Sequence, residues 1–395
     1  MHKFRGLIPV LALLTVPLAP PAAADTGTPD DTGAFNDTGT PDDTGTSFEL
    51  YGHLSPAVTS VDDGVARKNS FADNSHSKSR IGFRAFRALD SDYRLGFRFE
   101  TAFGFRTTED ISQDDTPALQ NLTREDIRRV DLQLFTPRFG TLFVGQGSMS
   151  SDGIGQIDLS GTRLVNDVSS SGDASGGFFF RNADSSLSDI TVSDVLGDFD
   201  ASRRGRIRYD TPEFAGVILS ASYGKEVLDT DTDQEDFYTG VALAYSKVFD
   251  NEVEFAAGIA FNRRDRRPDE GAPFTRDDIY GSASLRLKSG VSLSVALGNR
   301  DTEGVSFDSR YYYLKAGYEA HWFGFGATAV SIDYFDGSDY IEEGDASLAW
   351  GVGVVQRVDA VNGEFSLGYR RNRYNQQLAS FKPVDAVIAA ARFSF

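Results

Sequence analysis

Residues 93–106 read Tyr-Arg-Leu-Gly-Phe-Arg-Phe-Glu-Thr-Ala-Phe-Gly-Phe-Arg, and large apolar side chains alternate with charged ones along most of the stretch. One face would carry Tyr93, Leu95, Phe97, Phe99, Phe103 and Phe105, and the opposite face Arg94, Arg98, Glu100 and Arg106. Successive side chains of a β-strand point to opposite faces, so the stretch predicts a strand with one apolar and one charged face. A soluble sheet and a membrane barrel with a polar lumen both produce this pattern, and one strand does not separate them.

The same alternation recurs down the chain. At its end, residues 387–395 place apolar side chains at odd positions up to Phe395, with Arg392 and Ser394 between them. We expect about sixteen strands, over residues 48–60, 78–89, 92–106, 127–137, 139–148, 203–211, 215–224, 237–248, 251–263, 277–288, 290–300, 309–319, 321–335, 346–358, 361–373 and 384–395.

The connections between these segments favour a membrane barrel. Short ones, at 90–91, 138, 212–214, 250, 289, 320 and 359–360, alternate with longer ones at 61–77, 107–126, 149–202, 225–236, 264–276, 301–308, 336–345 and 374–383. Outer-membrane barrels have short turns on the periplasmic side and long loops outside. The sequence therefore predicts an all-β, antiparallel, up-and-down transmembrane barrel with both termini in the periplasm.

The N-terminal part has a different composition. Lys3 and Arg5 precede an apolar stretch, and Ala22-Ala23-Ala24 offers a cleavage site, so residues 1–24 are interpreted as a signal peptide. Residues 25–46 repeat Asp-Thr-Gly-Thr-Pro-Asp-Asp-Thr-Gly, a low-complexity composition that predicts a disordered acidic tail before a barrel over residues 47–395. The repeat lacks the ligand spacing of a calcium loop, and no metal or cofactor is expected.

Overall composition narrows the classes of partner. The formal net charge of −19 argues against a nucleic-acid partner, and the absence of cysteine excludes disulfides and cysteine–metal sites.

The order of several short motifs resembles that of the Gram-negative general-diffusion porins. They are Leu50-Tyr51-Gly52-His53-Leu54-Ser55-Pro56-Ala57, Ser79-Arg80-Ile81-Gly82-Phe83-Arg84, Phe139-Gly140-Thr141-Leu142-Phe143-Val144-Gly145-Gln146, Arg208-Tyr209-Asp210-Thr211-Pro212 and the terminal Phe395. The resemblance implies a homotrimer in the outer membrane of a Gram-negative bacterium, in contact with its lipid and passing ions and small hydrophilic solutes. It also implies that Phe395 is recognised by the barrel-assembly machinery, and that a long third loop folds into the lumen. The repeat-bearing tail and the length of that loop depart from the family pattern.

The longest connection, 149–202, is the candidate functional segment, because long loops in compact folds are usually functional. Its acidic residues include Asp152, Asp158, Asp167 and Asp173. Basic residues predicted to face the lumen are Arg80, Arg84, Arg94, Arg98, Arg129, Arg206 and Arg208. An acidic loop opposite a basic wall would set a transverse field at a constriction and select solutes by size and charge.

Alternatives remain open at this point. The loop acids could simply be solvated while the arginines pair with barrel neighbours such as Glu100 or Asp131. The arginines could instead make a substrate-specific channel, for sugars or for anions such as phosphate. A plugged or adhesive barrel is disfavoured, because no plug-sized segment precedes the first strand. An enzyme is disfavoured because no Gly-x-Ser-x-Gly or His-Glu-x-x-His motif occurs.

Overall fold

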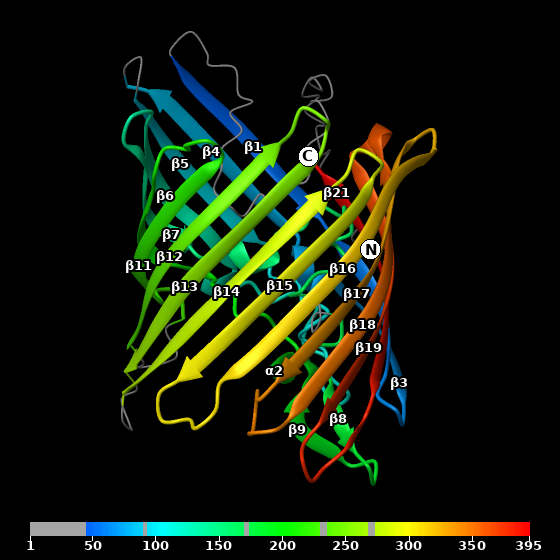
Figure 1. The fold of residues 1–395 in the computed structure, drawn as a ribbon. Coiled ribbons are helices and arrows are strands. Elements are labelled where there is room, and N and C mark those ends of the chain that lie inside the picture. The colour runs from blue at the N-terminus through cyan, green and yellow to red at the C-terminus, as the bar shows by residue number, and fades with distance from the viewer. Residues whose placement is uncertain (1–44, 90–92, 170–173, 230–234, 268–272) are drawn as a thin grey trace, which may run out of the picture.

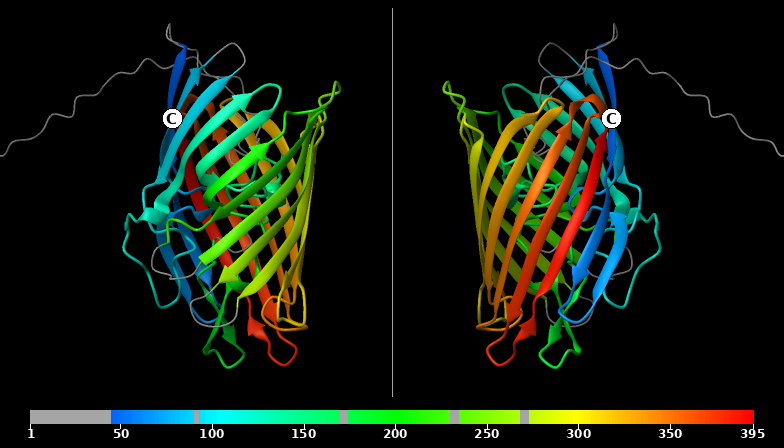
Figure 2. Two further views of the ribbon diagram at one scale, coloured as in Figure 1. Left: turned by 90° about the vertical axis from the view of Figure 1, so that its left-hand side faces the viewer. Right: turned by 90° about the vertical axis from the view of Figure 1, so that its right-hand side faces the viewer.

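The computed structural model describes residues 45–89, 93–169, 174–229, 235–267 and 273–395. The predicted signal peptide lies outside these ranges, as does the predicted tail up to residue 44. The described chain forms a closed antiparallel β-barrel with almost no helix, and its strands are inclined to the barrel axis (Figures 1 and 2). In the described ranges, no helix is long and apolar enough to cross a membrane.

The barrel strands form one sheet. They are β1 (Thr46–Leu54), β2 (Pro56–Asp62), β3 (Arg67–Asp73), β4 (Arg80–Ala88), β5 (Arg94–Ala102), β6 (Ile127–Thr136), β7 (Gly140–Ser148), β10 (Arg203–Asp210), β11 (Val217–Lys225), β12 (Glu235–Val248), β13 (Glu254–Arg267), β14 (Phe274–Arg286), β15 (Val291–Thr302), β16 (Ser309–Phe323), β17 (Gly326–Ser338), β18 (Ala346–Val358), β19 (Gly363–Asn375) and β21 (Val384–Ser394). A separate small sheet contains β8 (Phe179–Asn182), β9 (Leu187–Thr191) and β20 (Phe381–Lys382).

Two of the barrel strands are interrupted, which reconciles this list with the predicted number. β1 and β2 are separated by Ser55 and both pair with β21, while their partners on the other side are β4 and β3. β1 and β2 together therefore make one broken barrel strand, and β3 and β4 make a second. Counted in this way, the wall has the sixteen strands that the sequence predicts.

The C-terminal strand closes the barrel. β21 pairs with β19 on one side and with β1 and β2 on the other. Gly52 and Phe395 exchange two backbone hydrogen bonds of 3.0 Å, so the last residue of the chain joins the final strand to the first. Closure leaves the wall without an unpaired edge, which lipid would not tolerate.

The apolar face of the strands points outward, as predicted. On β15, Leu293 is 55% exposed and Val295 and Leu297 are also exposed, whereas Ser292 and Ser294 are buried. On β21, Val387 is exposed while Ile388 and Ala390 are buried. β15 alternates apolar-out and polar-in, whereas the inward Ile388 and Ala390 of β21 pack on Leu164 and Val165 of the long connection. An apolar outer face is typical of a barrel whose wall contacts lipid.

Three connections differ from the prediction. The first hairpin turns at residues 63–66, because β3 continues the pairing with β2 along a polar stretch whose alternation is weak. β16 runs on to Phe323 and turns at residues 324–325, so the turn predicted at Ala320 is wrong. The connection 149–202, expected to be irregular, contains β8, β9 and the short helix α2 (Val192–Val195).

Candidate functional site

The first part of the long connection, residues 150–166, lies against the inner face of the later strands. Its polar groups bond to inward-facing serines and a tyrosine of successive strands. Ser150 N donates to Ser222 Oγ on β11 (2.9 Å), and Ile157 N and Leu159 N donate to Ser282 and Ser284 Oγ on β14 (2.9 Å each). Thr162 Oγ1 then donates to Ser331 Oγ on β17 (2.7 Å). The segment therefore crosses the strands in chain order while keeping its backbone groups satisfied.

Glycines on the wall allow this close approach. A Cβ at Gly258 of β13 would lie 3.0 Å from Ile154, and one at Gly353 of β18 would lie 2.7 Å from Val165. Larger residues at these two positions would displace the segment from the wall.

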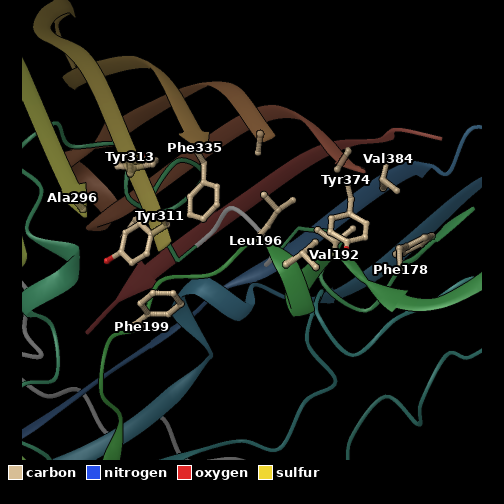
Figure 3. Packing of buried hydrophobic residues seen from close by; sticks show 14 of the residues in the cluster. Phe178, Val192, Leu196, Phe199, Ala296, Tyr311, Tyr313, Phe335, Tyr374 and Val384 are labelled. Atoms are coloured by element: carbon tan, nitrogen blue, oxygen red, sulfur yellow. The ribbon is translucent and has the colours of Figure 1, made fainter. Parts of the chain in front are cut away.

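The second part of the connection packs by apolar contact. Phe178, Val192, Leu196 and Phe199 meet Tyr311, Phe335, Tyr374 and Val384 in one buried cluster (Figure 3). The Phe199 ring lies edge-on to Tyr311, with 5.1 Å between ring centroids. An apolar cluster excludes water locally, so the second part of the connection is held against β16, β17 and β19.

On the other side of the interior lies a charged cavity of about 550 Å³. It is lined by parts of β4 to β7 and β10, the neighbouring loops, and positions within residues 152–169 and 201–202 of the long connection. Its basic lining residues are Lys78, Arg80, Arg128, Arg163, Arg203 and Arg204, and its acidic ones are Glu125, Asp126, Asp152, Glu226 and Asp229. In the described chain, the lining includes no residue of β12 to β19.

The predicted basic residues divide into two groups. Arg80 lines the cavity. The other six pair with carboxylates or rings of the wall. Arg98 and Arg206 donate to Asp131 (3.2 and 2.7 Å), Arg208 donates to Asp210 (2.8 Å), and Arg129 lies 3.7 Å from Glu100. Arg84 lies over the Tyr51 ring and Arg94 over the Phe135 ring. The pairing with Glu100 and Asp131 is the arrangement that the sequence left open as an alternative.

The predicted acidic residues also differ in placement. Asp152 lines the cavity. Asp158 is buried and accepts a hydrogen bond from Lys315 Nζ (2.6 Å). Asp167 accepts one from Arg163 Nε (2.7 Å), and the charges of Arg163, His76 and Lys315 outweigh its burial and lower its pKa to about 2. Asp173 lies outside the described residues.

The sequence model of the Gram-negative porins matches residues 10–380, nearly the whole chain. This chain belongs to the Gram-negative porin family. No curated protein sequence matches it. Family and fold together support an outer-membrane channel.

Solved structures of several porins share the fold. The anion-selective porin from Comamonas acidovorans is 17% identical, with 89% of this chain and 100% of that one covered and a TM-score of 0.61. The trimer form of OmpT from Vibrio cholerae is 14% identical, covering 89% and 99%, with a TM-score of 0.56. OmpF of Salmonella typhi, in complex with daunomycin, is 14% identical, covering 89% and 98%, with a TM-score of 0.55.

Sequence reasoning missed some basic residues of the porin's cavity. Arg128 and Arg129 are neighbours and should face opposite sides, yet Arg128 lines the cavity while Arg129 is buried beside Glu100. The pairing of β5 with β6 shifts register next to Glu100, and such a bulge re-aims side chains. Arg204, Arg206 and Arg208 are two residues apart on one strand and therefore lie on the same face, so the inward position of Arg204 could have been predicted from the alternation.

A second group of missed residues is acidic and lies at the end of the porin's long connection. Asp200 accepts hydrogen bonds from Gly153 N (2.7 Å) and Gly155 N (3.4 Å), and Asp198 accepts one from Gln156 Nε2 (2.8 Å). Burial, together with the charges of Asp198 and Asp152, raises the pKa of Asp200 well above its ordinary value. In the described ranges, no group of three His, Cys, Asp or Glu side chains is arranged to hold a metal ion.

Proposed function

We propose that this porin is a diffusion channel for ions and small hydrophilic solutes, and that residues 149–202 narrow its interior. The observation that carries the proposal is the division of the interior. Most of the hydrogen bonds and apolar contacts described above lie along β11 to β19, with further contacts to β2, β21 and Asn74. The charged cavity is bordered by β4 to β7 and β10 and by parts of the same long connection. Solutes would pass through the cavity, where fixed charges of both signs replace part of their hydration.

Of the predicted residues, Asp152 and Arg80 are the ones we propose to act on passing solutes, since both line the cavity. The proposed filter also includes Arg128, Arg163, Arg203 and Arg204. Asp158, Asp167 and the arginines around Asp131 would set the shape of the passage rather than meet the solute.

The test is conductance of the purified protein in planar bilayers. We expect stepwise, ohmic currents, and Asp152→Asn should shift the reversal potential in a salt gradient toward anion preference. Asp301→Asn is the matched control. Asp301 is exposed at the end of β15, four residues after the outward-facing Leu297, and therefore lies on the same outer face of the strand. Absence of conductance, or a reversal potential that Asp152→Asn leaves unchanged, would contradict the proposal.

A second candidate is a channel selective for anions. The cavity lining carries one more basic than acidic residue, and the Comamonas acidovorans porin of the same fold is described as anion-selective. Reversal potential in the unmodified protein separates the two: strong anion preference with saturable block by one anion would support the selective channel.

We further propose that the porin acts as a homotrimer in the outer membrane. A trimer form exists for the Vibrio cholerae protein of the same fold. The wall is asymmetric, since β4 to β7, β10 and β11 have 8 to 10 residues while β12 to β19 have 12 to 15. Conductance steps in groups of three and the mass of the detergent complex would test this; a monomer by both measurements would refute it.

The remaining expectations concern export and assembly. We propose that residues 1–24 are removed, that the acidic residues 25–46 and Phe395 both lie in the periplasm, and that Phe395 is recognised during assembly. N-terminal sequencing of the outer-membrane form and deletion of Phe395 test these points.

A further inference from the structure

Lys315 is a buried cation on the inner face of β16. It is 3% exposed, and Nζ donates to Asp158 Oδ2 (2.6 Å) and to the backbone oxygen of Asn166. Both partners belong to the long connection, at two separate points of the segment that crosses the wall. One wall residue thus holds two points of the segment.

The carboxylate of Asp158 is satisfied on both oxygens. Oδ1 accepts from Ser160 N (2.8 Å) and Ser294 Oγ (3.2 Å), and Oδ2 accepts from Ser160 Oγ (3.0 Å) as well as from Lys315. A buried charge is tolerated only when it is paired and hydrogen-bonded, and this geometry meets that condition.

A neighbouring ion pair provides the contrast. Arg370 on β19 donates to Asp333 on β17 (2.6 Å), and Tyr313 Oη on β16 donates to the same carboxylate (2.9 Å). This pair is as deeply buried, but it joins strand to strand. In the described chain, both hydrogen bonds of Lys315 go to the long connection. The charge of Lys315 is therefore compensated by the docked segment, and removal of Lys315 would leave the Asp158 carboxylate buried without its cation.

We propose that Lys315 is a positioning residue: its contacts with Asp158 and Asn166 hold residues 158–166 on the wall and thereby fix the width of the passage. The inference rests on the proposed role of residues 149–202 as the narrowing segment. It assigns Asp158 to the docking of this segment rather than to contact with solute.

A thiol probe tests docking independently of conductance. The chain has no cysteine, and Val165 is 6% exposed where it packs on Gly353. In a Val165→Cys background, a water-soluble methanethiosulfonate should label the protein slowly. Adding Lys315→Met should raise the labelling rate at least roughly tenfold, since breaking a buried pair leaves an uncompensated charge. Arg370→Met is the matched control and should leave labelling slow.

Conductance supplies the functional readout. Lys315→Met should give larger and noisier open-channel currents and admit larger neutral solutes, whereas Lys315→Arg, which keeps a buried donor, should restore narrower currents. Should Lys315→Met fail to assemble, Asp158→Asn removes the same contact from the other partner and is expected to label quickly.

The outcomes separate the two proposals. Slow labelling and unchanged currents in both Lys315→Met and Asp158→Asn would overturn the positioning role and leave the channel proposal intact. Equal acceleration by Arg370→Met would also overturn it, by showing a general loosening of the wall. A channel that does not conduct would refute the proposed function, while the labelling would still decide the docking role.

Discussion

On both sides of the barrel interior every second residue of a strand points inward, but the inward side chains differ between the two sides. Along β12 to β19 many inward positions are small, including Gly258, Ser282, Ser294, Ser331 and Gly353, and the long connection lies on them. Along β4 to β10 they are long and charged, and the cavity remains open there. Small polar side chains let another backbone approach and bond, whereas arginines and carboxylates pair laterally and keep water nearby.

The two sides are also held by different interactions. The open side depends on cross-strand ion pairs, in which Asp131 on β6 bonds to Arg98 on β5 and to Arg206 on β10. The covered side depends on the apolar cluster around Phe199 and on the bonds of Asp158 and Asp167. Disruption of the first should weaken the wall, and disruption of the second should free the loop.

The largest effect is expected at Asp131. Asp131→Ala leaves Arg98 and Arg206 buried without their shared carboxylate, and should lower the free energy of unfolding by about 3–5 kcal/mol. Lys288→Ala is the control, because Lys288 and its partner Glu252 are both 67% exposed and this pair should contribute little. Urea titration of folding into lipid vesicles measures both, and equal losses would remove the distinction between buried and rim pairs.

A smaller and local effect is expected at Phe199. Its ring contacts Tyr311 and Tyr340 and lies 4.1 Å below the Arg300 guanidinium. Phe199→Ala should destabilise docking of the long connection by about 3 kcal/mol, hence roughly 100-fold faster proteolysis within residues 174–202. The wall itself should resist unfolding as before. Phe214→Ala, at an 82% exposed ring, should change neither property; wall unfolding together with cleavage would show that the loop and wall are one unit.

The smallest effect concerns pH. The pKa of Asp167 is lowered to about 2 by Arg163, His76 and Lys315, from an ordinary value of 3.8. Its contribution to the folded state is present above pH ~4 and is lost as the pH falls through about 2, amounting to ~2 kcal/mol. The part from Arg163 lies within the long connection, and the parts from His76 and Lys315 act between the connection and the wall. Pepsin cleavage of the loop, normalised to an unfolded substrate, should therefore accelerate between pH 4 and pH 2. Asp167→Asn should flatten this dependence, while the exposed Asp189→Asn should not.

Much of the wall could be predicted from local pattern. The segments 93–106 and 387–395 each show the two-residue period. Strand β5 forms over Arg94–Ala102, ending four residues before the predicted end, and β21 over Val384–Ser394, both with the predicted apolar face outward. The prediction failed where a strand lacks that period, as in Arg67–Asp73, and where a bulge near Glu100 turns Arg128 inward. The pairing of Arg67–Asp73 with β2 and the bulge near Glu100 both depend on the neighbouring strand, so neither can be seen in the sequence of one segment.

The candidate site was only partly accessible to sequence reasoning. The long connection was recognised by its length, and Asp152 and Arg80 both line the cavity. Asp158 has the same residue type and comes from the same loop as Asp152, yet it is buried on Lys315. Arg98 and Arg206 similarly share Asp131 instead of lining the cavity.

The sequence by itself determined the barrel: strand number, outward face and the rhythm of its connections follow from side-chain alternation, a property of neighbouring residues on one backbone. The tertiary structure alone decided which inward charges border the cavity. Asp158 and Lys315 are 157 residues apart in the chain, and Arg206 and Asp131 are 75 apart. Whether a charged side chain forms an ion pair or is exposed to water depends on which distant strand or loop lies beside it. Closure of the barrel determines which segments become neighbours.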